Sequence, residues 1–228
     1  MRKILVLALF LTCLTVGCSK KYDSIEEYAE AMNTVQKAQK SYTLEFENLS
    51  WISDTYYKAF LKNDLWKYSQ STNHGRNYIR TVLYDGNDIT GYGEHSKWAT
   101  LIASPETTED KELHTRVHNI ASQLLNWNKP SCLYTNKEDK PKFINNNAKM
   151  NGFDCRLIKY SDSYEVCVND KLGIAVYLKT SLDEGKDSTI NLLKVDTTEL
   201  ADSTFVLPEN KQKTTLENML KELAKGNF

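Results

Sequence analysis

Apolar residues recur at three- and four-residue spacing in three stretches of the chain, which predicts three amphipathic helices. The first is expected over residues 25–40, after the capping box Ser24-x-x-Glu27. The second begins at Ser104-Pro105, and the third follows a second capping box, Thr214-x-x-Glu217. Their apolar stripes consist of Ile25, Tyr28, Met32 and Val35; of Leu113, Val117, Ile120, Leu124 and Trp127; and of Leu216, Met219, Leu220 and Leu223.

Alternation of apolar and polar residues predicts strands between these helices, beginning at Tyr42. Residues 135–147 are polar and are expected to form a loop, and residues 182–188 a charged turn. No linker-like stretch interrupts the strands, and neighbouring antiparallel strands need only short turns, so one continuous curved sheet of about ten strands is predicted. The central helix is expected to cover its concave face. The further strands are expected at residues 55–62, 65–71, 77–84, 89–92, 97–103, 153–160, 164–169, 173–180, 190–196 and 204–207.

The N-terminus, MRKILVLALFLTCLTVGC, departs from the rest of the chain. Two basic residues precede an apolar run over residues 4–16, which is too short to span a bilayer as a permanent helix. The sequence Thr15-Val16-Gly17 before Cys18 resembles the lipobox of bacterial lipoproteins. This resemblance implies a signal peptide over residues 1–17, cleavage before Cys18 and diacylglycerol on the Cys18 sulfur. The alternative is an ordinary secretory signal in which Cys18 is incidental.

A short tether of residues 18–23 would then join the lipid to a single domain over residues 24–228. Ser19 follows the cysteine, rather than the Asp that resembles an inner-membrane retention signal, so the periplasmic face of the outer membrane is favoured. The first capping box begins six residues after Cys18, and the domain is therefore expected to lie close to the membrane surface.

The composition and charge of the chain argue against several classes of protein. The formal net charge of −1 and the pI of about 6.4 argue against a nucleic-acid partner, and the mean hydropathy of −0.54 excludes a polytopic membrane protein. Loss of residues 1–17 removes two basic residues and leaves 27 basic against 30 acidic, a net charge of −3. No G-x-S-x-G, S-x-x-K, C-x-x-C or phosphate-binding glycine motif occurs, so neither an enzyme activity nor a cofactor is predicted.

Three segments resemble the lipoprotein-carrier superfamily, whose fold is that of LolA and LolB. TVLYDG (81–86), followed by KWA (97–99), is similar to its strand–Asp-Gly–strand segment. MNGFDC (150–155), YEVCV (164–168) and GIAV (173–176) are similar to its next run of strands, and DSTFVLP (202–208) is similar to its D-x-x-F-x-x-P tail. The resemblance implies an α+β fold, in which the sheet forms an unclosed, or half, β-barrel covered by helices. Its hollow would be lined by apolar side chains.

The function implied by this resemblance is binding of a lipid, an acyl chain or another hydrophobic ligand, for example in lipoprotein or lipid trafficking at the outer membrane. The expected cavity-lining residues are Tyr56, Trp66, Tyr78 and Trp98, since aromatic linings suit acyl chains. The alternative is that these rings fill an ordinary core. The protein would then be a non-enzymatic structural or protein-interaction lipoprotein.

Three cysteines remain for redox chemistry: Cys132, Cys155 and Cys167. An exported chain meets an oxidising compartment, so a Cys155–Cys167 disulfide across the predicted hairpin is favoured. The two face each other only if the turn centres on Ser161. A two-residue Ser161-Asp162 turn would put Cys155 opposite Val168 instead. Cys132 paired to either cysteine, or three free thiols, are the alternatives.

A metal site is not expected. His114 and His118 share one face of the central helix, but their segment lacks the glutamate that a zincin requires, and a solvated helix face is favoured.

Overall fold

The computed structural model describes residues 22–50, 54–71, 80–105, 111–115, 117, 141–182 and 186–224. These residues form one twelve-stranded sheet in the order β12-β6-β5-β4-β3-β2-β1-β11-β10-β9-β8-β7. The strands are β1 (Ser41–Ser50), β2 (Asp54–Lys62), β3 (Leu65–Ser71), β4 (Arg80–Tyr84), β5 (Ile89–Gly93), β6 (Trp98–Ala103), β7 (Lys142–Met150), β8 (Phe153–Ser161), β9 (Tyr164–Asn169), β10 (Ile174–Leu182), β11 (Lys186–Asp196) and β12 (Gln212–Thr215). The sheet is accompanied by α2 (Ile25–Ala38), a 3-10 turn η2 (Asp202–Phe205) and α4 (Leu216–Ala224).

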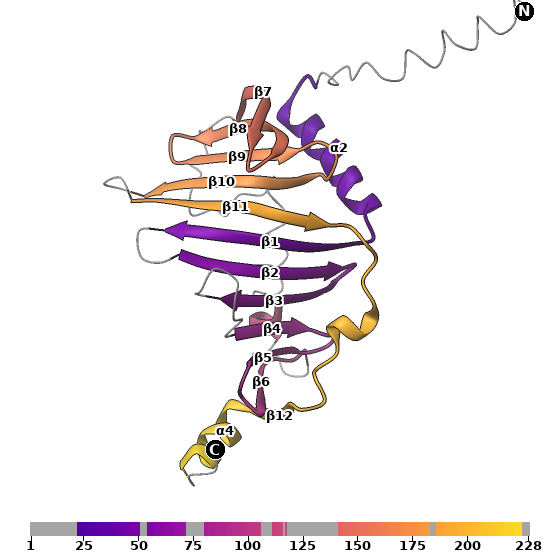
Figure 1. Ribbon diagram of the computed structural model, residues 1–228, viewed down its shortest axis with the longest axis vertical. Coiled ribbons are helices and arrows are strands. Elements are labelled where there is room, and N and C mark those ends of the chain that lie inside the picture. The colour runs from indigo at the N-terminus through magenta and orange to yellow at the C-terminus, as the bar shows by residue number, and fades with distance from the viewer. Residues whose placement is uncertain are drawn as a thin grey trace, which may run out of the picture.

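The sheet grows outward from β1, which pairs with β2 on one side and with β11 on the other (Figure 1). Neighbouring strands of the sheet pair antiparallel, except that β12 pairs with β6 in parallel, and β7 and β12 form the two edges, so the sheet does not close. The predicted α+β class and unclosed antiparallel sheet are therefore confirmed. The number of strands is twelve rather than about ten.

The strand that the sequence pattern missed on one edge is β7. Six of its nine residues are exposed at positions where a central strand would alternate between apolar and polar residues, and two register irregularities interrupt its pairing with β8. An edge strand needs few apolar side chains, and polar residues protect it from further pairing. The prediction of a loop through residue 147 was wrong for this reason.

The other edge strand, β12, reaches the sheet through the segment that follows β11, and the alternation of apolar and polar residues does not predict this path. After β11, residues 197–211 run along the ends of β1 to β5 (Figure 1). Ser41 Oγ donates to the Thr198 carbonyl at 3.0 Å, and Lys62 Nζ donates to the Leu200 carbonyl at 2.7 Å. The Gln212 amide then donates to the Lys97 carbonyl at 2.8 Å, and β12 pairs with β6 in parallel.

One predicted strand and one predicted turn were also wrong. The expected strand at residues 204–207 is the 3-10 turn η2, in which the Thr204 amide bonds to the Ala201 carbonyl and Phe205 is buried. The expected turn at 182–188 is narrower, because β10 extends to Leu182 and β11 begins at Lys186. These two strands pair with each other over that extension, which satisfies backbone groups that a longer turn would leave to water.

Helix α2 begins where the capping box predicts. Ser24 Oγ accepts the Glu27 amide at 3.0 Å, and the Glu27 carboxylate accepts the Asp23 amide at 2.9 Å. The helix ends at Ala38, two residues before its expected end. At α4 the capping side chain is Thr215, whose hydroxyl accepts the Asn218 amide at 3.2 Å, rather than Thr214.

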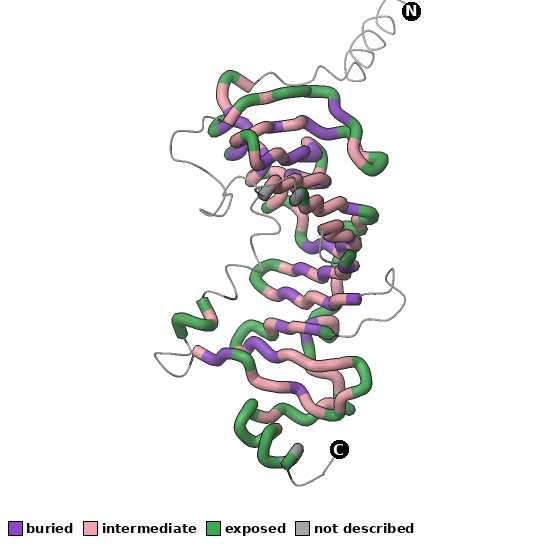
Figure 2. The backbone as a smooth tube through the Cα atoms, turned by 90° about the vertical axis from the view of Figure 1, so that its left-hand side faces the viewer, coloured by how far each residue is buried: buried purple, intermediate pink, exposed green. Residues whose placement is uncertain are grey.

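Each face of the sheet carries its own cluster of buried residues, and buried positions recur along the strands (Figure 2). One face, here called the α2 face, packs Ile158, Tyr160, Tyr164, Val166 and Val168 against α2. The opposite face, here called the aromatic face, carries the larger cluster, which extends from Ala103 on β6 to Ala148 on β7. Neither α2 nor α4, the helices that the structure describes in full, has the length and apolar character of a bilayer crossing.

Of the expected central helix, residues 111–115 and 117 are helical, and Val117 packs against the cluster of the aromatic face. Ser104 and Pro105, where the helix was expected to begin, are not helical, and Pro105 lies in a turn. The rest of that helix, and with it the expected cover over the concave face, lies outside the described residues.

Candidate functional site

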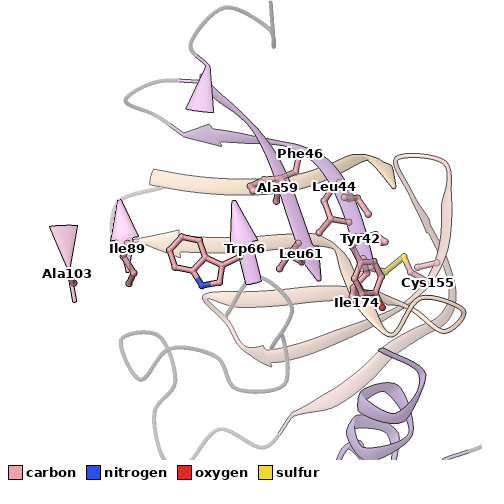
Figure 3. Close-up of a cluster of buried hydrophobic side chains, with 14 residues drawn as sticks. Tyr42, Leu44, Phe46, Ala59, Leu61, Trp66, Ile89, Ala103, Cys155 and Ile174 are labelled. Carbon is pink, nitrogen blue, oxygen red and sulfur yellow. A yellow bond between two sulfur atoms is a disulfide. The ribbon is translucent and has the colours of Figure 1, made fainter. Parts of the chain in front are cut away.

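The aromatic face is built from cross-strand rows of apolar side chains. Because side chains alternate between faces, directly paired residues of neighbouring strands share one face. The first row crosses β1 to β6 and consists of Tyr42, Leu61, Trp66, Tyr84, Ile89 and Ala103. Figure 3 labels five of these residues, all except Tyr84. The next row includes Leu44, Ala59, Tyr68 and Val82. The result is an apolar band across half of the sheet.

Aromatic rings touch one another along this band. The Trp66 ring lies 5.5 Å from Tyr68 and 5.8 Å from Tyr84, between ring centroids, and Phe46 stacks on Tyr57 at 5.0 Å. Burial raises the pKa of the Tyr42 hydroxyl to about 12, and it also raises the pKa of Tyr68. Burial disfavours the charged form of these two hydroxyls, as expected for groups that lie within an apolar band.

Three of the four residues expected to line a cavity are described, and these three do not form one cluster. Trp66 is buried in the aromatic face, and Trp98 is half-buried outside the cluster with the Lys97 ammonium 5.0 Å from its ring centroid. Tyr56 lies on the opposite face from Tyr57, and Tyr78 lies outside the described residues. Sequence reasoning missed Tyr57, although Tyr57 shares its alternation with Ala59 and Leu61, which are both buried.

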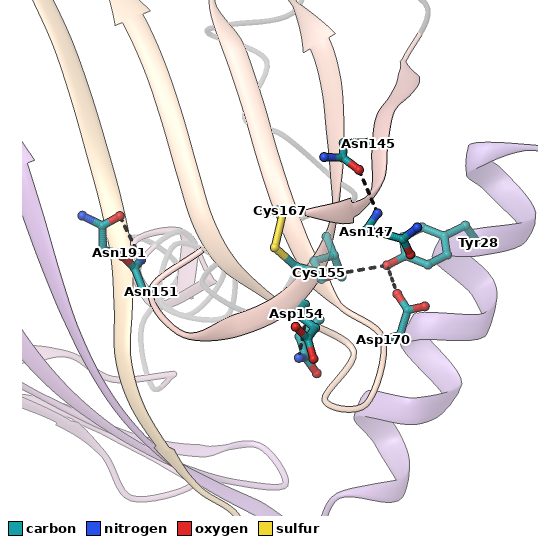
Figure 4. The surroundings of a disulfide bond; sticks show 11 residues. Tyr28, Asn145, Asn147, Asn151, Asp154, Cys155, Cys167, Asp170 and Asn191 are labelled. Carbon is teal, nitrogen blue, oxygen red and sulfur yellow. Dashed lines mark hydrogen bonds between the residues drawn. A yellow bond between two sulfur atoms is a disulfide. The ribbon is translucent and has the colours of Figure 1, made fainter. Parts of the chain in front are cut away.

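A buried arginine connects α2 to the strands beneath it. The Arg156 side chain is 5% exposed, and its Nε donates to Asp170 Oδ2 at 2.8 Å. Its guanidinium carbon lies 5.1 Å from the centroid of Tyr22 and 5.5 Å from that of Tyr28, which places the cation against two aromatic rings. Tyr28 donates its hydroxyl to Asp170 Oδ1 at 2.7 Å (Figure 4). Burial, followed by this carboxylate, raises the pKa of Tyr28.

A disulfide joins Cys155 to Cys167, with 5.5 Å between their Cα atoms (Figure 4). The pair is the one that the sequence favoured, but the cysteines are not directly opposite, since Leu157 faces Cys167. The hairpin turn is Asp162-Ser163, and an irregularity between Lys159 and Ser161 restores the parity that puts both sulfurs on one face. Neither turn considered from the sequence is therefore the one adopted. Cys132 lies outside the described residues.

A polar pocket of about 390 Å³ opens beside this disulfide, between β7, β8 and the turn that joins β9 to β10. Its walls carry both signs of charge and several amides. The lining residues are Asn146, Asn147, Ala148, Asp154, Cys155, Arg156, Asn169, Asp170 and Lys171.

Within the described part of the chain, no three His, Cys, Asp or Glu side chains are grouped as metal ligands would be. His114 Nε2 lies 3.1 Å from the Asn87 carbonyl, and its ring meets the Tyr84 ring edge-on. His118 lies outside the described residues.

The sequence matches no protein-family model and no curated protein. Solved structures do resemble it. An uncharacterized conserved protein from Thermus thermophilus superposes with a TM-score of 0.52 at 6% identity, over 82% of this chain and 98% of that one. A LolA superfamily protein from Nitrosomonas europaea gives 0.37 at 10% identity, over 82% and 99%. The lipoprotein LppX of Mycobacterium tuberculosis gives 0.43 at 11% identity, over 75% and 94%.

These identities make the likeness one of fold, and among the three only the Thermus protein exceeds a TM-score of 0.5. Function must therefore be argued from the residues of this chain.

Proposed function

We propose that this protein is a bacterial cell-envelope lipoprotein, anchored at the outer membrane through acylated Cys18, whose aromatic face binds an acyl chain or another apolar ligand. It carries out no reaction. The observation that supports ligand binding is the band of touching aromatic rings across the aromatic face. The lipobox-like sequence before Cys18 supports the anchor.

The composition of the band suits an acyl chain. Long apolar ligands gain affinity from buried area and from contact with aromatic faces, and they need few polar partners. Tyr57, Tyr68 and Tyr84 are partly buried, so they combine contact with the buried cluster and accessible ring surface.

Two adjacent residues of β2 provide a matched test. Tyr57 belongs to the aromatic face and stacks on Phe46, whereas Tyr56 points to the other side of the same strand. The sheet, α2 and α4 lie within residues 22–224, so the chain from Ser19 onward retains them and can be studied without the anchor. The probe is cis-parinaric acid, a fluorescent fatty acid, titrated into this chain, and native mass spectrometry checks for co-purified lipid.

Tyr57→Asp is expected to weaken fatty-acid binding at least about tenfold, because a charge is placed among apolar contacts. Tyr56→Asp should leave the binding constant within about twofold. Circular dichroism and urea unfolding establish that both variants fold. Ligand binding on this face is refuted if no lipid co-purifies and the unaltered chain does not bind the probe saturably, or if both variants bind equally well.

The anchor has its own test. Metabolic labelling with an alkyne analogue of palmitate should mark the full chain, and peptide mass spectrometry should find the mature chain beginning at acylated Cys18. Cys18→Ser should abolish both the label and the cleavage. A mature chain that begins elsewhere, without lipid, would indicate an ordinary secretory signal.

A second candidate is a protein-interaction lipoprotein whose core is already filled. The burial of Trp66 at 3% and of Leu61 at 7% exposure favours it, because these side chains are covered without a ligand. On this alternative neither the unaltered chain nor Tyr56→Asp binds the fatty acid saturably. The titration above therefore separates the two candidates.

A further inference from the structure

The polar pocket beside Arg156 has walls that are fixed by hydrogen bonds. Asn169 Oδ1 accepts the backbone amides of Lys171 and Leu172 at 3.0 and 2.9 Å, and Asn169 Nδ2 donates to the Asp154 carbonyl at 2.8 Å. This network holds the β9–β10 turn against β8. The pocket's volume of about 390 Å³ lies within the range of small-molecule sites, which are usually preformed in this way.

Lys171 and Asp154, at the rim of the pocket, set its charge, because the other two charged residues of the lining neutralise each other. Asp170 bonds through Oδ1 to Tyr28 and through Oδ2 to Arg156, so it neutralises the buried guanidinium. Lys171 and Asp154 are exposed, line the same pocket and form no ion pair among the described residues. The rim thus offers one cation and one anion, with the Asn147 amide also on the lining.

The pocket also lies close to the site of proposed acylation. Tyr22 packs 5.1 Å from the guanidinium of Arg156, which lines the pocket. The chain from Cys18 to Tyr22 extends over four residue steps, or about 14 Å at most. If Cys18 is acylated as proposed above, this end of the sheet lies within reach of the phospholipid headgroups.

We propose that the polar pocket binds a zwitterionic phosphoethanolamine headgroup, in which Lys171 contacts the phosphate and Asp154 accepts hydrogen bonds from the ammonium. The Asn147 amide supplies a further donor to the phosphate oxygens. A group that carries both charges satisfies both rim residues, whereas phosphate alone leaves Asp154 opposed to an anion. The inference rests on the proposed anchor for its membrane setting, but the binding chemistry belongs to the pocket itself.

Calorimetric titration of the chain from Ser19 onward tests the chemistry with O-phosphoethanolamine, inorganic phosphate and ethanolamine. The zwitterion is expected to bind at least about tenfold more tightly than either fragment. Lys171→Gln and Asp154→Asn should each weaken it about tenfold, since each removes a charge-assisted hydrogen bond. Lys194→Gln, at an exposed position of β11 outside the pocket lining, is the control and should change nothing. Equal binding of phosphate and phosphoethanolamine, or unchanged binding in both pocket variants, overturns the proposal.

Vesicle flotation then tests whether the headgroup is recognised in a membrane. The same chain should float with vesicles of phosphatidylethanolamine and phosphatidylglycerol more than with vesicles of phosphatidylcholine and phosphatidylglycerol in the same ratio, because a quaternary ammonium has no N–H to donate to Asp154. Binding of free O-phosphoethanolamine without this preference would assign the pocket to a soluble phosphocompound and refute the membrane role. Because the chain lacks Cys18 and flotation requires no acyl transfer, its failure is distinguishable from failure of the anchor.

Discussion

Asp170→Asn tests whether the buried Arg156 guanidinium depends on a single countercharge. The substitution keeps the shape of the side chain and leaves an oxygen that can still accept the Tyr28 hydroxyl. It removes the negative charge 2.8 Å from a guanidinium that is 5% exposed. Breaking a fully buried pair from one side costs about 3–5 kcal/mol. Because the Asp170 side chain is 39% exposed, water screens part of the interaction, and we expect a loss of about 2 kcal/mol.

A double-mutant cycle separates the pair from its surroundings. Arg156→Met, Asp170→Asn and the double variant are unfolded in urea with the disulfide intact, and the free energy of unfolding is obtained by linear extrapolation. The double variant should be more stable than the sum of the single losses predicts, by about 1–2 kcal/mol. Asp187→Asn is the matched control. It breaks the Lys179–Asp187 pair, which has 2.7 Å between Nζ and Oδ2 but side chains 34% and 44% exposed.

The control should lose no more than about 0.5 kcal/mol, since exposed pairs contribute little. If Asp170→Asn costs as little as Asp187→Asn, and the cycle shows no coupling, then Arg156 is stabilised by the tyrosine rings rather than by the carboxylate. That result would refute the electrostatic account of how α2 is held on the sheet.

Three further predictions concern the packing of α2. Gly173→Ala should lower the free energy of unfolding in urea by at least about 3 kcal/mol, because φ is +69° and the added Cβ would lie 2.4 Å from the Met32 carbonyl oxygen. Gly152→Ala, where φ is +86° and no atom lies near the added Cβ, should lower it by only about 1 kcal/mol. Equal losses in the two variants would contradict the close approach of Gly173 to α2. Tyr160→Phe should be neutral or stabilising by up to about 1 kcal/mol in thermal unfolding, because the buried Tyr160 hydroxyl has no hydrogen-bond partner among the described residues; a clear loss would reveal one. Burial raises the pKa of Tyr164 from 10.0 to about 12, so Tyr164 loses its proton at a lower pH in the unfolded state than in the folded state. The free energy of unfolding should therefore be unaffected by Tyr164 below pH 10 and should fall by up to about 3 kcal/mol as the pH rises toward 12. Tyr164→Phe should reduce that fall in urea titrations, and an unchanged pH profile would exclude Tyr164 as its source.

Local signals in the sequence were sufficient to predict the position of most helices and strands. The Ser24 capping box and the spacing of Ile25, Tyr28 and Met32 determine where α2 begins and which side it buries. Period-2 alternation was strong enough to locate the central strands, and β3 and β9 have the predicted bounds. The favoured cysteine pair is the one that forms, but the sequence did not predict the irregularity between Lys159 and Ser161 that puts both sulfurs on one face.

Features that depend on distant residues could not be obtained in this way. β7 is polar because it lies at an edge, and β12 is a strand because the return after β11 brings it to β6. Alternation groups Tyr57 with Ala59 and Leu61 on one side of β2, and the register with β1 and β3 then places that side among the aromatic rings of the neighbouring strands.

The Arg156 site shows the same division most clearly. The sequence by itself determined a strand with an arginine in it, as well as a tyrosine on a helix more than a hundred residues earlier. Only the tertiary structure brought Tyr28, Arg156 and Asp170 together and buried the cation. Periodicity reports which side of an element is apolar, whereas the partner of a buried charge is set by which elements meet, and that is decided by the packing of the whole sheet.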